Sequence, residues 1–418
     1  MNTEGQPKKS IFRREKILGF SHICALILVL TALGLNASHA RSLYELSVTS
    51  NGQTSTQDYS DIETFVDQLS NDGLKQINPA YTETSAAVSV LDVRGLPAIA
   101  SYNENSTTLN FSVPSLDINL DFNGTNRNES KSQFFDFLKG EGASILTRLL
   151  QGFVSQTAVD PVAGNPNSMV AKMAQDDFRA AATSDAGGEH NLFGLGLMAG
   201  HSQATGFQTN SISVPINYIY TLPNSSKSPY LLILDMPLRY LNVEGAEIYD
   251  GSVGLGATLP ILNTWSLTPM FRYGAVGSFN SGSIQAVYSG SVTSKFDFYM
   301  NDLKLSSNNM IGYYETGSLS NKFGGNYDLQ NVIFRNGLSA EGSLNYTLFD
   351  EPTSWEVQFI DTRVTGDKWF IDGYEEIVAT VGTRRRMARM DWQTLRFGAS
   401  LTLGKAFQGG QLLFSYRF

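Results

Sequence analysis

Apolar side chains alternate with polar or glycine residues from Asn191 to the end of the chain, in segments of about ten residues. In the clearest segment, residues 394–403, every second residue from Leu395 to Leu403 is apolar. Successive side chains of a strand point to opposite faces, so this period predicts β-structure. The other segments lie at 191–200, 209–221, 229–242, 252–261, 264–278, 283–299, 302–316, 327–349, 354–366, 374–385 and 409–418. Together they predict about twelve strands, separated by turns rich in Gly, Asn, Asp, Ser and Pro.

The two faces of these strands differ in chemistry. The apolar faces include aromatic residues such as Trp265, Phe271 and Tyr273, whereas the opposite faces carry small and charged side chains. A transmembrane barrel has an apolar outer band with aromatic girdles and a polar lumen, while a soluble barrel or sandwich buries its apolar face. The pattern favours a transmembrane antiparallel barrel, with a secreted sandwich as the alternative. In the barrel, the charges predicted to face the lumen are Asp235, Arg239, Arg272, Arg335, Glu341, Glu356 and Arg396.

The last segment ends on alternating apolar residues, with Leu413 as a departure from the pattern. It resembles the C-terminal signal of Gram-negative outer-membrane barrels, a final strand with a terminal Phe that the barrel assembly machinery engages. The resemblance assigns this role to Phe414, Tyr416 and Phe418.

Residues 1–40 read as an export signal. Five basic residues precede an apolar run of 13 residues, 23–35, and small residues follow at Ser38 and Ala40. This pattern predicts a signal peptide cleaved after Ala40, because a membrane-spanning anchor needs about 20 apolar residues. Cys24, the single cysteine, lies within this segment, so the mature chain has no disulfide and no thiolate metal site.

The composition of the chain excludes one class of function and indicates a location. Charged residues make up only 17% of the chain, and cleavage after Ala40 leaves 25 basic against 37 acidic residues, a net charge of −12. An acidic exported chain has few of the basic side chains that bind phosphates, which excludes a nucleic-acid partner. The export signal and the barrel pattern predict the outer membrane of a Gram-negative bacterium, with its lipids and lipopolysaccharide as partners and a monomer as the state of the chain.

Two helices are predicted before the strands. Apolar residues in 131–156 recur at spacings of three and four, interrupted by Gly140 and Gly142, and a second helix follows Pro166 and runs to about Thr183. The second helix suits the inside of a polar pore and equally a protein surface. We expect residues 130–189 to form a helical linker or plug, before a barrel at 190–418.

A helix followed by about twelve strands and a terminal Phe resembles the translocator domain of autotransporters. The stretch 160–168 (DPVAGNPNS), which leads into the second helix, resembles the solitary outer-membrane autotransporter barrels. The resemblance implies a helix in the lumen, no large secreted passenger, and a structural or surface-display function. A small porin is the alternative. Residues 41–129, rich in Ser, Thr, Asn and Asp, are expected to form a small α+β region or a loosely ordered leader.

Candidate chemistry is sparse. His190 and His201 are the only histidines of the mature chain, and Ser202 follows His201. Neighbouring strand residues point to opposite faces, so this pair does not form a dyad. No catalytic, cofactor-binding or metal-binding residue is predicted, and a hydrolase at the barrel rim remains the least favoured alternative. The basic run 384–386 suits a membrane rim or a polar turn.

Overall fold

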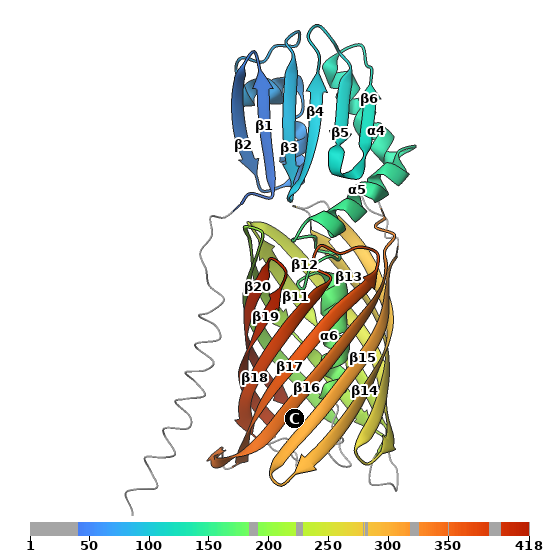
Figure 1. Cartoon of the computed structure of the whole chain (residues 1–418), viewed down its shortest axis with the longest axis vertical. Coiled ribbons are helices and arrows are strands. Elements are labelled where there is room, and N and C mark those ends of the chain that lie inside the picture. The colour runs from blue at the N-terminus through green and yellow to red at the C-terminus, as the bar shows by residue number, and fades with distance from the viewer. Residues whose placement is uncertain are drawn as a thin grey trace, which may run out of the picture.

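The computed structural model describes residues 41–183, 191–222, 229–278, 280, 283–317, 326–349, 351–383 and 394–417. The predicted signal peptide with Ala40, and also His190, the run 384–386 and Phe418, lie outside these residues. The described chain forms a small N-terminal unit and a β-barrel, stacked end to end (Figure 1).

The barrel is a closed antiparallel sheet of twelve strands, as the sequence pattern predicted. Its elements are β7 (Leu192–Ala204), β8 (Phe207–Val214), β9 (Ile216–Thr221), β10 (Leu231–Asp235), β11 (Leu238–Val243), β12 (Ala246–Leu262), β13 (Trp265–Ser278), β14 (Ser283–Met300), β15 (Leu303–Gly317), β16 (Gln330–Leu348), β17 (Glu351–Gly366), β18 (Gly373–Thr383), β19 (Thr394–Gly404) and β20 (Phe407–Arg417). The last strand pairs with the first along its whole length, from Phe407 opposite Ala204 to Arg417 opposite Gly194, so no open edge remains.

Two barrel strands are interrupted by proline. Pro215 separates β8 from β9, and Pro237 lies between β10 and β11. Proline has no N–H group to donate to the neighbouring strand, so the ladder breaks there while the chain continues in the same direction. Each of the predicted segments 209–221 and 229–242 is therefore one barrel strand made of two shorter elements.

The apolar faces of the strands point outward. On β13, Phe271 and Tyr273 are 73% and 54% exposed, while Met270 before them and Arg272 between them are buried. The same alternation on β12 exposes Tyr249 and Leu255. A soluble protein rarely exposes an apolar surface of this extent, and hydrocarbon chains of lipid would cover it without loss of hydrogen bonds. This arrangement contradicts the soluble sandwich.

The N-terminal unit is an ordered α+β structure and not a loose leader. Its antiparallel sheet has the order β2 (Gln53–Tyr59), β1 (Tyr44–Ser50), β3 (Ala87–Val93), β4 (Leu96–Tyr102), β5 (Leu109–Val113), β6 (Ile118–Phe122), with a 3-10 turn at Pro114–Leu116. Three helices pack on it: α2 (Ile62–Asp67), α3 (Asn71–Ile77) and α4 (Arg127–Lys139). Side chains at their N-termini accept backbone N–H groups: Asp61 from Thr64, Ser70 from Gly73, and Asn126 from Glu129.

Helix α4 belongs to this unit. Phe134 lies against Phe111 and Phe122, with ring centroids 4.5 and 5.5 Å away. Arg127 is buried, and its guanidinium donates to the backbone oxygens of Ser85 and Asn103. The boundary drawn after residue 129 therefore falls inside α4, because the helical period alone does not show which surface a helix covers.

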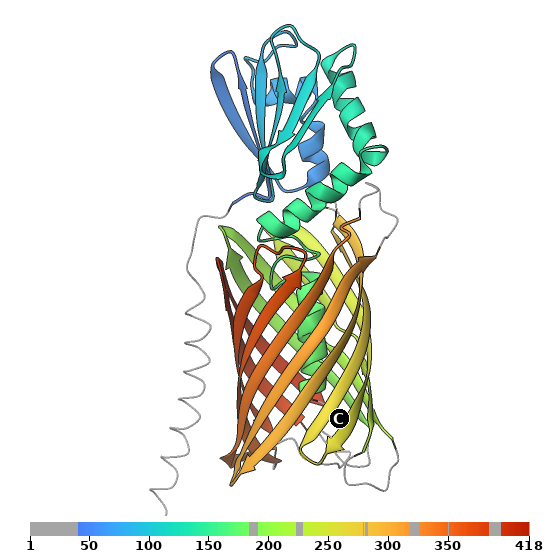
Figure 2. The ribbon, with the colours of Figure 1, turned by 45° about the vertical axis from the view of Figure 1, so that its right-hand side comes forward.

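The helices that follow bridge the two parts. α5 (Ala143–Gln156) begins after the break at Gly140 and Gly142 and lies across one mouth of the barrel (Figure 2). α6 (Met169–Ala182) runs inside the lumen toward the other mouth (Figures 1 and 2). Of the described helices in the segment predicted as linker or plug, α6 is the one inside the barrel. Among the described helices, none has the length and apolar composition needed to span a bilayer.

Replacing Phe134 with Ala should lower the free energy of unfolding of the N-terminal unit by about 3–5 kcal/mol, because it leaves a cavity between the sheet and α4. The change is measured from the urea concentration at which a protease begins to cleave the chain within residues 41–139. Val88→Ala, at an exposed position of the same sheet, should stay within about 0.5 kcal/mol of the original chain. Equal losses in the two variants would contradict the packing described.

Candidate functional site

Helix α6 is buried on nearly all sides in the lumen, and the linker before it fixes its entry. Asp160 accepts hydrogen bonds from the backbone N–H groups of Val162 and Ala163, at 2.9 and 3.2 Å. Gly164 has a φ of +94°, and a Cβ there would lie 2.3 Å from the backbone oxygen of Val154, so this position requires glycine. The stretch 160–168 is thus a compact turn that leads the chain from the barrel mouth into the lumen.

The helix lies against one side of the barrel, packed on β13, β14 and β15. Small residues of the wall allow this close approach: a Cβ at Gly274 would lie 2.1 Å from the terminal methyl carbon of Met169.

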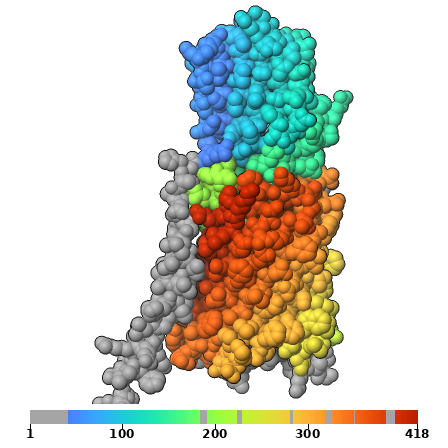
Figure 3. Space-filling model, in the orientation of Figure 1, coloured from blue at the N-terminus to red at the C-terminus, as the bar shows by residue number. Residues whose placement is uncertain are grey.

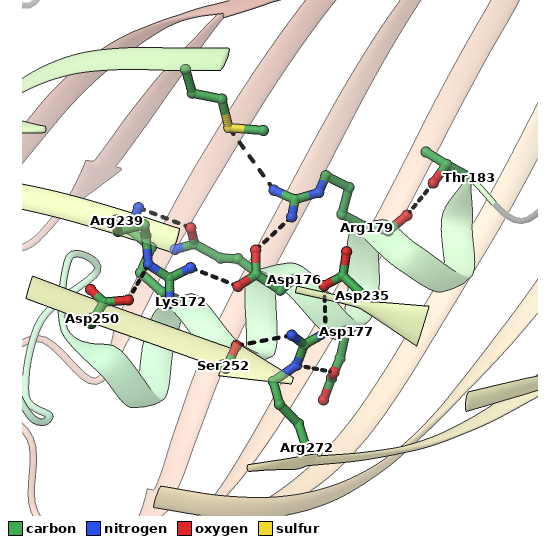
Figure 4. A network of polar contacts seen from close by, with 12 residues as sticks. Lys172, Asp176, Asp177, Arg179, Thr183, Asp235, Arg239, Asp250, Ser252 and Arg272 are labelled. Carbon is green, nitrogen blue, oxygen red and sulfur yellow. Dashed lines mark hydrogen bonds and ion pairs between the residues drawn. The ribbon is translucent and has the colours of Figure 1, made fainter. Parts of the chain in front are cut away.

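Asp177 of α6 joins the first of two charge clusters in the lumen (Figure 4). The guanidinium of Arg272 contacts the carboxylates of Asp177 and Asp235, each at 2.7 Å, and donates to Ser252 Oγ at 3.0 Å. Ser291 donates to the second oxygen of Asp177 at 3.0 Å. The three charged side chains are at most 1% exposed.

Asp176 joins the second cluster. Arg239 contacts Asp176 and Asp250, both at 2.6 Å, and Arg179 of α6 contacts the other oxygen of Asp176 at 2.7 Å. Asp250 and Arg239 belong to paired strands, while Asp176 belongs to the helix (Figure 4). Each cluster therefore joins the helix to the barrel wall through an arginine.

These clusters bear on stability because removing one partner leaves a buried charge uncompensated. Such a loss costs about 3–5 kcal/mol, whereas an exposed pair contributes about 0–1 kcal/mol. At the other end of α6, two wall cations hold the last carbonyl groups. Lys295 donates to the oxygen of Ala182 at 2.8 Å, and Arg417 to that of Thr183 at 2.9 Å. Cations at a helix C-terminus are also favoured by the helix dipole.

Of the seven charged residues predicted to face the lumen, six are buried and one is half-buried. Asp235, Arg239 and Arg272 belong to the two clusters. Arg335 contacts Glu376 at 2.5 Å, and its guanidinium carbon lies 5.2 Å from the centre of the Phe178 ring of α6. Arg396 is 3.8 Å from Glu356. The seventh residue, Glu341, is half-buried on β16 and accepts a hydrogen bond from Ser354.

Sequence reasoning missed four acidic partners: Asp176, Asp177, Asp250 and Glu376. The sequence did contain a signal for Asp250. It lies two residues before Ser252, which begins the predicted strand 252–261 on its polar face, so Asp250 is expected on the same polar face. For α6, the two adjacent acids stand out in a helix otherwise rich in Ala and Met. Their partners depend on the rotation of α6 within the barrel, which the sequence does not show.

A cavity of about 210 Å³ remains in the lumen on the side of α6 away from β13–β15. Its walls come from α6 and from barrel strands that include β7 and β16–β20. Leu413, the departure from alternation in the last strand, faces this cavity.

No catalytic pair forms at His201. Its Nδ1 is 2.9 Å from Asn210 Oδ1 on the outer face, while Ser202 is buried and accepts a hydrogen bond from Asn167 at 2.6 Å. Within the described ranges, no group of three or more His, Cys, Asp or Glu residues is placed to hold a metal ion.

The barrel mouth beside the N-terminal unit has a buried cluster of its own. Arg94 of that unit is 3.3 Å from Asp160 of the linker, and Tyr327 of the barrel donates to Asp160 at 3.0 Å. Burial raises the pKa of Asp160, and it raises that of nearby Tyr44 to about 12. Backbone bonds add to the joint: Ile62 donates to the oxygen of Asn280 at 2.9 Å, and Arg41 to that of Gly206 at 3.2 Å. The two parts meet along one continuous surface in Figure 3.

The fold and the lumen define the protein as a barrel of the outer-membrane type with a helix inside it. Comparison with solved structures finds autotransporter barrels among the matches. The β domain of the Bordetella autotransporter BrkA is 12% identical, with a TM-score of 0.44, and the match covers 55% of this chain and 98% of that one. The translocator domain of the autotransporter NalP from Neisseria meningitidis is 10% identical, with a TM-score of 0.42, covering 60% and 95%.

Channel barrels are also among the matches. The KdgM porin is 8% identical, with a TM-score of 0.31, covering 53% of this chain and 99% of the porin. The matched structures therefore include both translocator domains and porins. No protein-family model matches the chain, and no curated protein sequence does.

Replacing Arg272 with Gln should lower the free energy of unfolding by about 3–5 kcal/mol, because Asp177 and Asp235 would remain buried without their cation. Urea unfolding of the chain in detergent or lipid measures the loss. The matched control is Arg363→Gln, since Arg363 also joins two carboxylates, Asp361 and Glu375, but is 51% exposed. The control should lose about 1 kcal/mol or less, and an equal loss in both variants would contradict the role given to Arg272.

Proposed function

We propose that this chain is an outer-membrane barrel that carries its small N-terminal unit on the cell surface, with the pore closed by α6. The observation that carries the proposal is the path of the chain. It leaves the N-terminal unit at one mouth, passes through the lumen as α6, and enters β7 at the other mouth (Figure 1).

The outer apolar band and the predicted export signal support the location in the outer membrane. A β-barrel crosses a bilayer with every backbone group paired, and this one closes through β20 and β7. Lipids and lipopolysaccharide would then contact the outer face, and the barrel assembly machinery is the expected partner during insertion. We keep the prediction of a monomer.

The sidedness follows from how a barrel crosses a membrane. If the strands insert as hairpins from the periplasm, an even number of strands leaves the start of β7 and the end of β20 on the periplasmic side. The chain before β7 then crosses the lumen as α6 from the external mouth to the periplasmic mouth, which places the N-terminal unit on the external surface. The N-terminal unit has about one hundred residues, a size that fits the expectation of surface display without a large passenger.

Closure of the pore is supported by two features. Both buried arginine clusters tie α6 to the wall, and the linker and N-terminal unit cover one mouth. A conducting porin would need a path past these elements, so we favour display over transport.

Cysteine labelling in intact cells tests the display. Asn119→Cys, exposed on the N-terminal unit, should react with a membrane-impermeant maleimide in intact cells. The control Asp302→Cys, in the exposed turn at the opposite end, should react only after the outer membrane is opened. The mature chain has no competing thiol, since the single cysteine is Cys24. The reverse labelling pattern would contradict the proposed orientation.

Single-channel recording tests the closure. The mature chain in planar bilayers should show no steady conductance, whereas a variant lacking residues 41–183 should conduct, because the linker and α6 are removed. Heat-modifiable migration on gels checks that the shortened barrel is folded. Steady conductance of the complete chain, equal to that of the shortened barrel, would instead support a porin.

A further inference from the structure

We propose that the luminal cavity beside α6 binds a small soluble anion that carries carboxylate or phosphate oxygens. The inference goes beyond surface display and does not depend on the orientation of the barrel. It starts from a helical stripe: Lys172, Gln175, Asp176, Arg179 and Thr183 recur at spacings of three and four and share the face of α6 that lines the cavity.

The charge of the lining is the first argument. Among the described residues, the cations in the lining outnumber the carboxylates by six to three: Lys172, Arg179, Arg239, Arg335, Arg396 and Arg417 against Asp176, Glu356 and Glu376. Asp250, behind Arg239, offsets one of these cations. Among the described residues, the cavity lining therefore has a formal excess of two positive charges, although the mature chain as a whole is acidic.

Unused donors are the second argument. Lys172 is 9% exposed, and its ammonium donates to Gln175 Oε1 at 3.0 Å, with no carboxylate within 4.0 Å among the described residues. An ammonium group has three N–H donors. Arg335 is 1% exposed, and its Nε has no hydrogen-bond partner in the described part of the chain. Both side chains line the same cavity, so two cations there have N–H donors available for a ligand.

The size of the cavity limits the ligand. A volume of about 210 Å³ admits several water molecules or a small organic anion. Buried donors of this kind are best satisfied by anionic oxygens, which form shorter and stronger hydrogen bonds than neutral acceptors. Wall groups such as Gln358, Ser400 and Gln411 would orient the remaining polar atoms of such a ligand.

Calorimetric titration of the complete mature chain in nanodiscs of zwitterionic lipid tests the proposal, with inorganic phosphate and citrate as probes. We expect saturable binding of at least one anion below ~10 mM. Lys172→Gln should weaken it about tenfold or more through loss of a charge-assisted bond. Lys405→Gln, in the exposed turn between β19 and β20, is the matched control and should bind as the original chain does. Heat-modifiable migration verifies that each variant is folded.

A second measurement needs no variant. Labelling of amines on the original chain, quantified for each lysine by mass spectrometry, should show several-fold protection of Lys172 by the bound anion and none of Lys405. Absence of saturable binding by both anions overturns the proposal. Equal affinity in a folded Lys172→Gln variant, or equal labelling of Lys172 with and without the anion, also overturns it.

Discussion

Burial of charge inside the barrel is the constraint on which the rest of this structure depends. Asp176 and Asp177 are adjacent on α6, and each contacts an arginine of the wall that also holds a second, wall carboxylate. A buried ion offsets its lost hydration only when its partners are close and well oriented. The helix therefore has one favourable rotation and depth in the lumen, and a shift by one turn would leave several charges unpaired.

The two ends of α6 are fixed by different means. At its C-terminal end, Lys295 from β14 and Arg417 from β20 hold the successive carbonyl groups of Ala182 and Thr183, so the last strand both closes the barrel and contacts the end of the helix. Before its first turn, Asp160 joins the linker to Arg94 of the N-terminal unit and to Tyr327 of the barrel. The placement of the N-terminal unit thus depends on the same segment that positions the helix.

Much of the barrel could be predicted from the sequence because a strand in a membrane wall obeys one local rule, the alternation of faces. The neighbouring residues Phe271 and Arg272 belong to the apolar and the polar face of one strand. The same alternation predicted that Arg239, Arg335 and Arg396 face the lumen. Proline made the rule harder to apply, since Pro215 and Pro237 divide single strands into two elements. The helices were predicted as elements, yet their locations depend on packing: Phe134 places α4 on the N-terminal sheet, and the carboxylates of α6 find partners from strands distant in the sequence. The assembly signal at Phe414, Tyr416 and Phe418 and the cleavage after Ala40 stay predictions.

The central claim is that direct contact between α6 and the wall arginines holds the helix in the lumen. A double-mutant cycle on Asp177 and Arg272 tests it most directly, with Asp177→Asn, Arg272→Gln and the combined variant compared by urea unfolding in lipid. The account predicts a coupling energy above about 1.5 kcal/mol, because the direct contact between Asp177 and Arg272 is lost in either single variant and can be lost only once in the double variant. Asp235 is without its cation in both variants that lack Arg272, so its cost cancels in the cycle. Additivity of the two changes within about 0.5 kcal/mol would show that the residues act independently and would contradict the account.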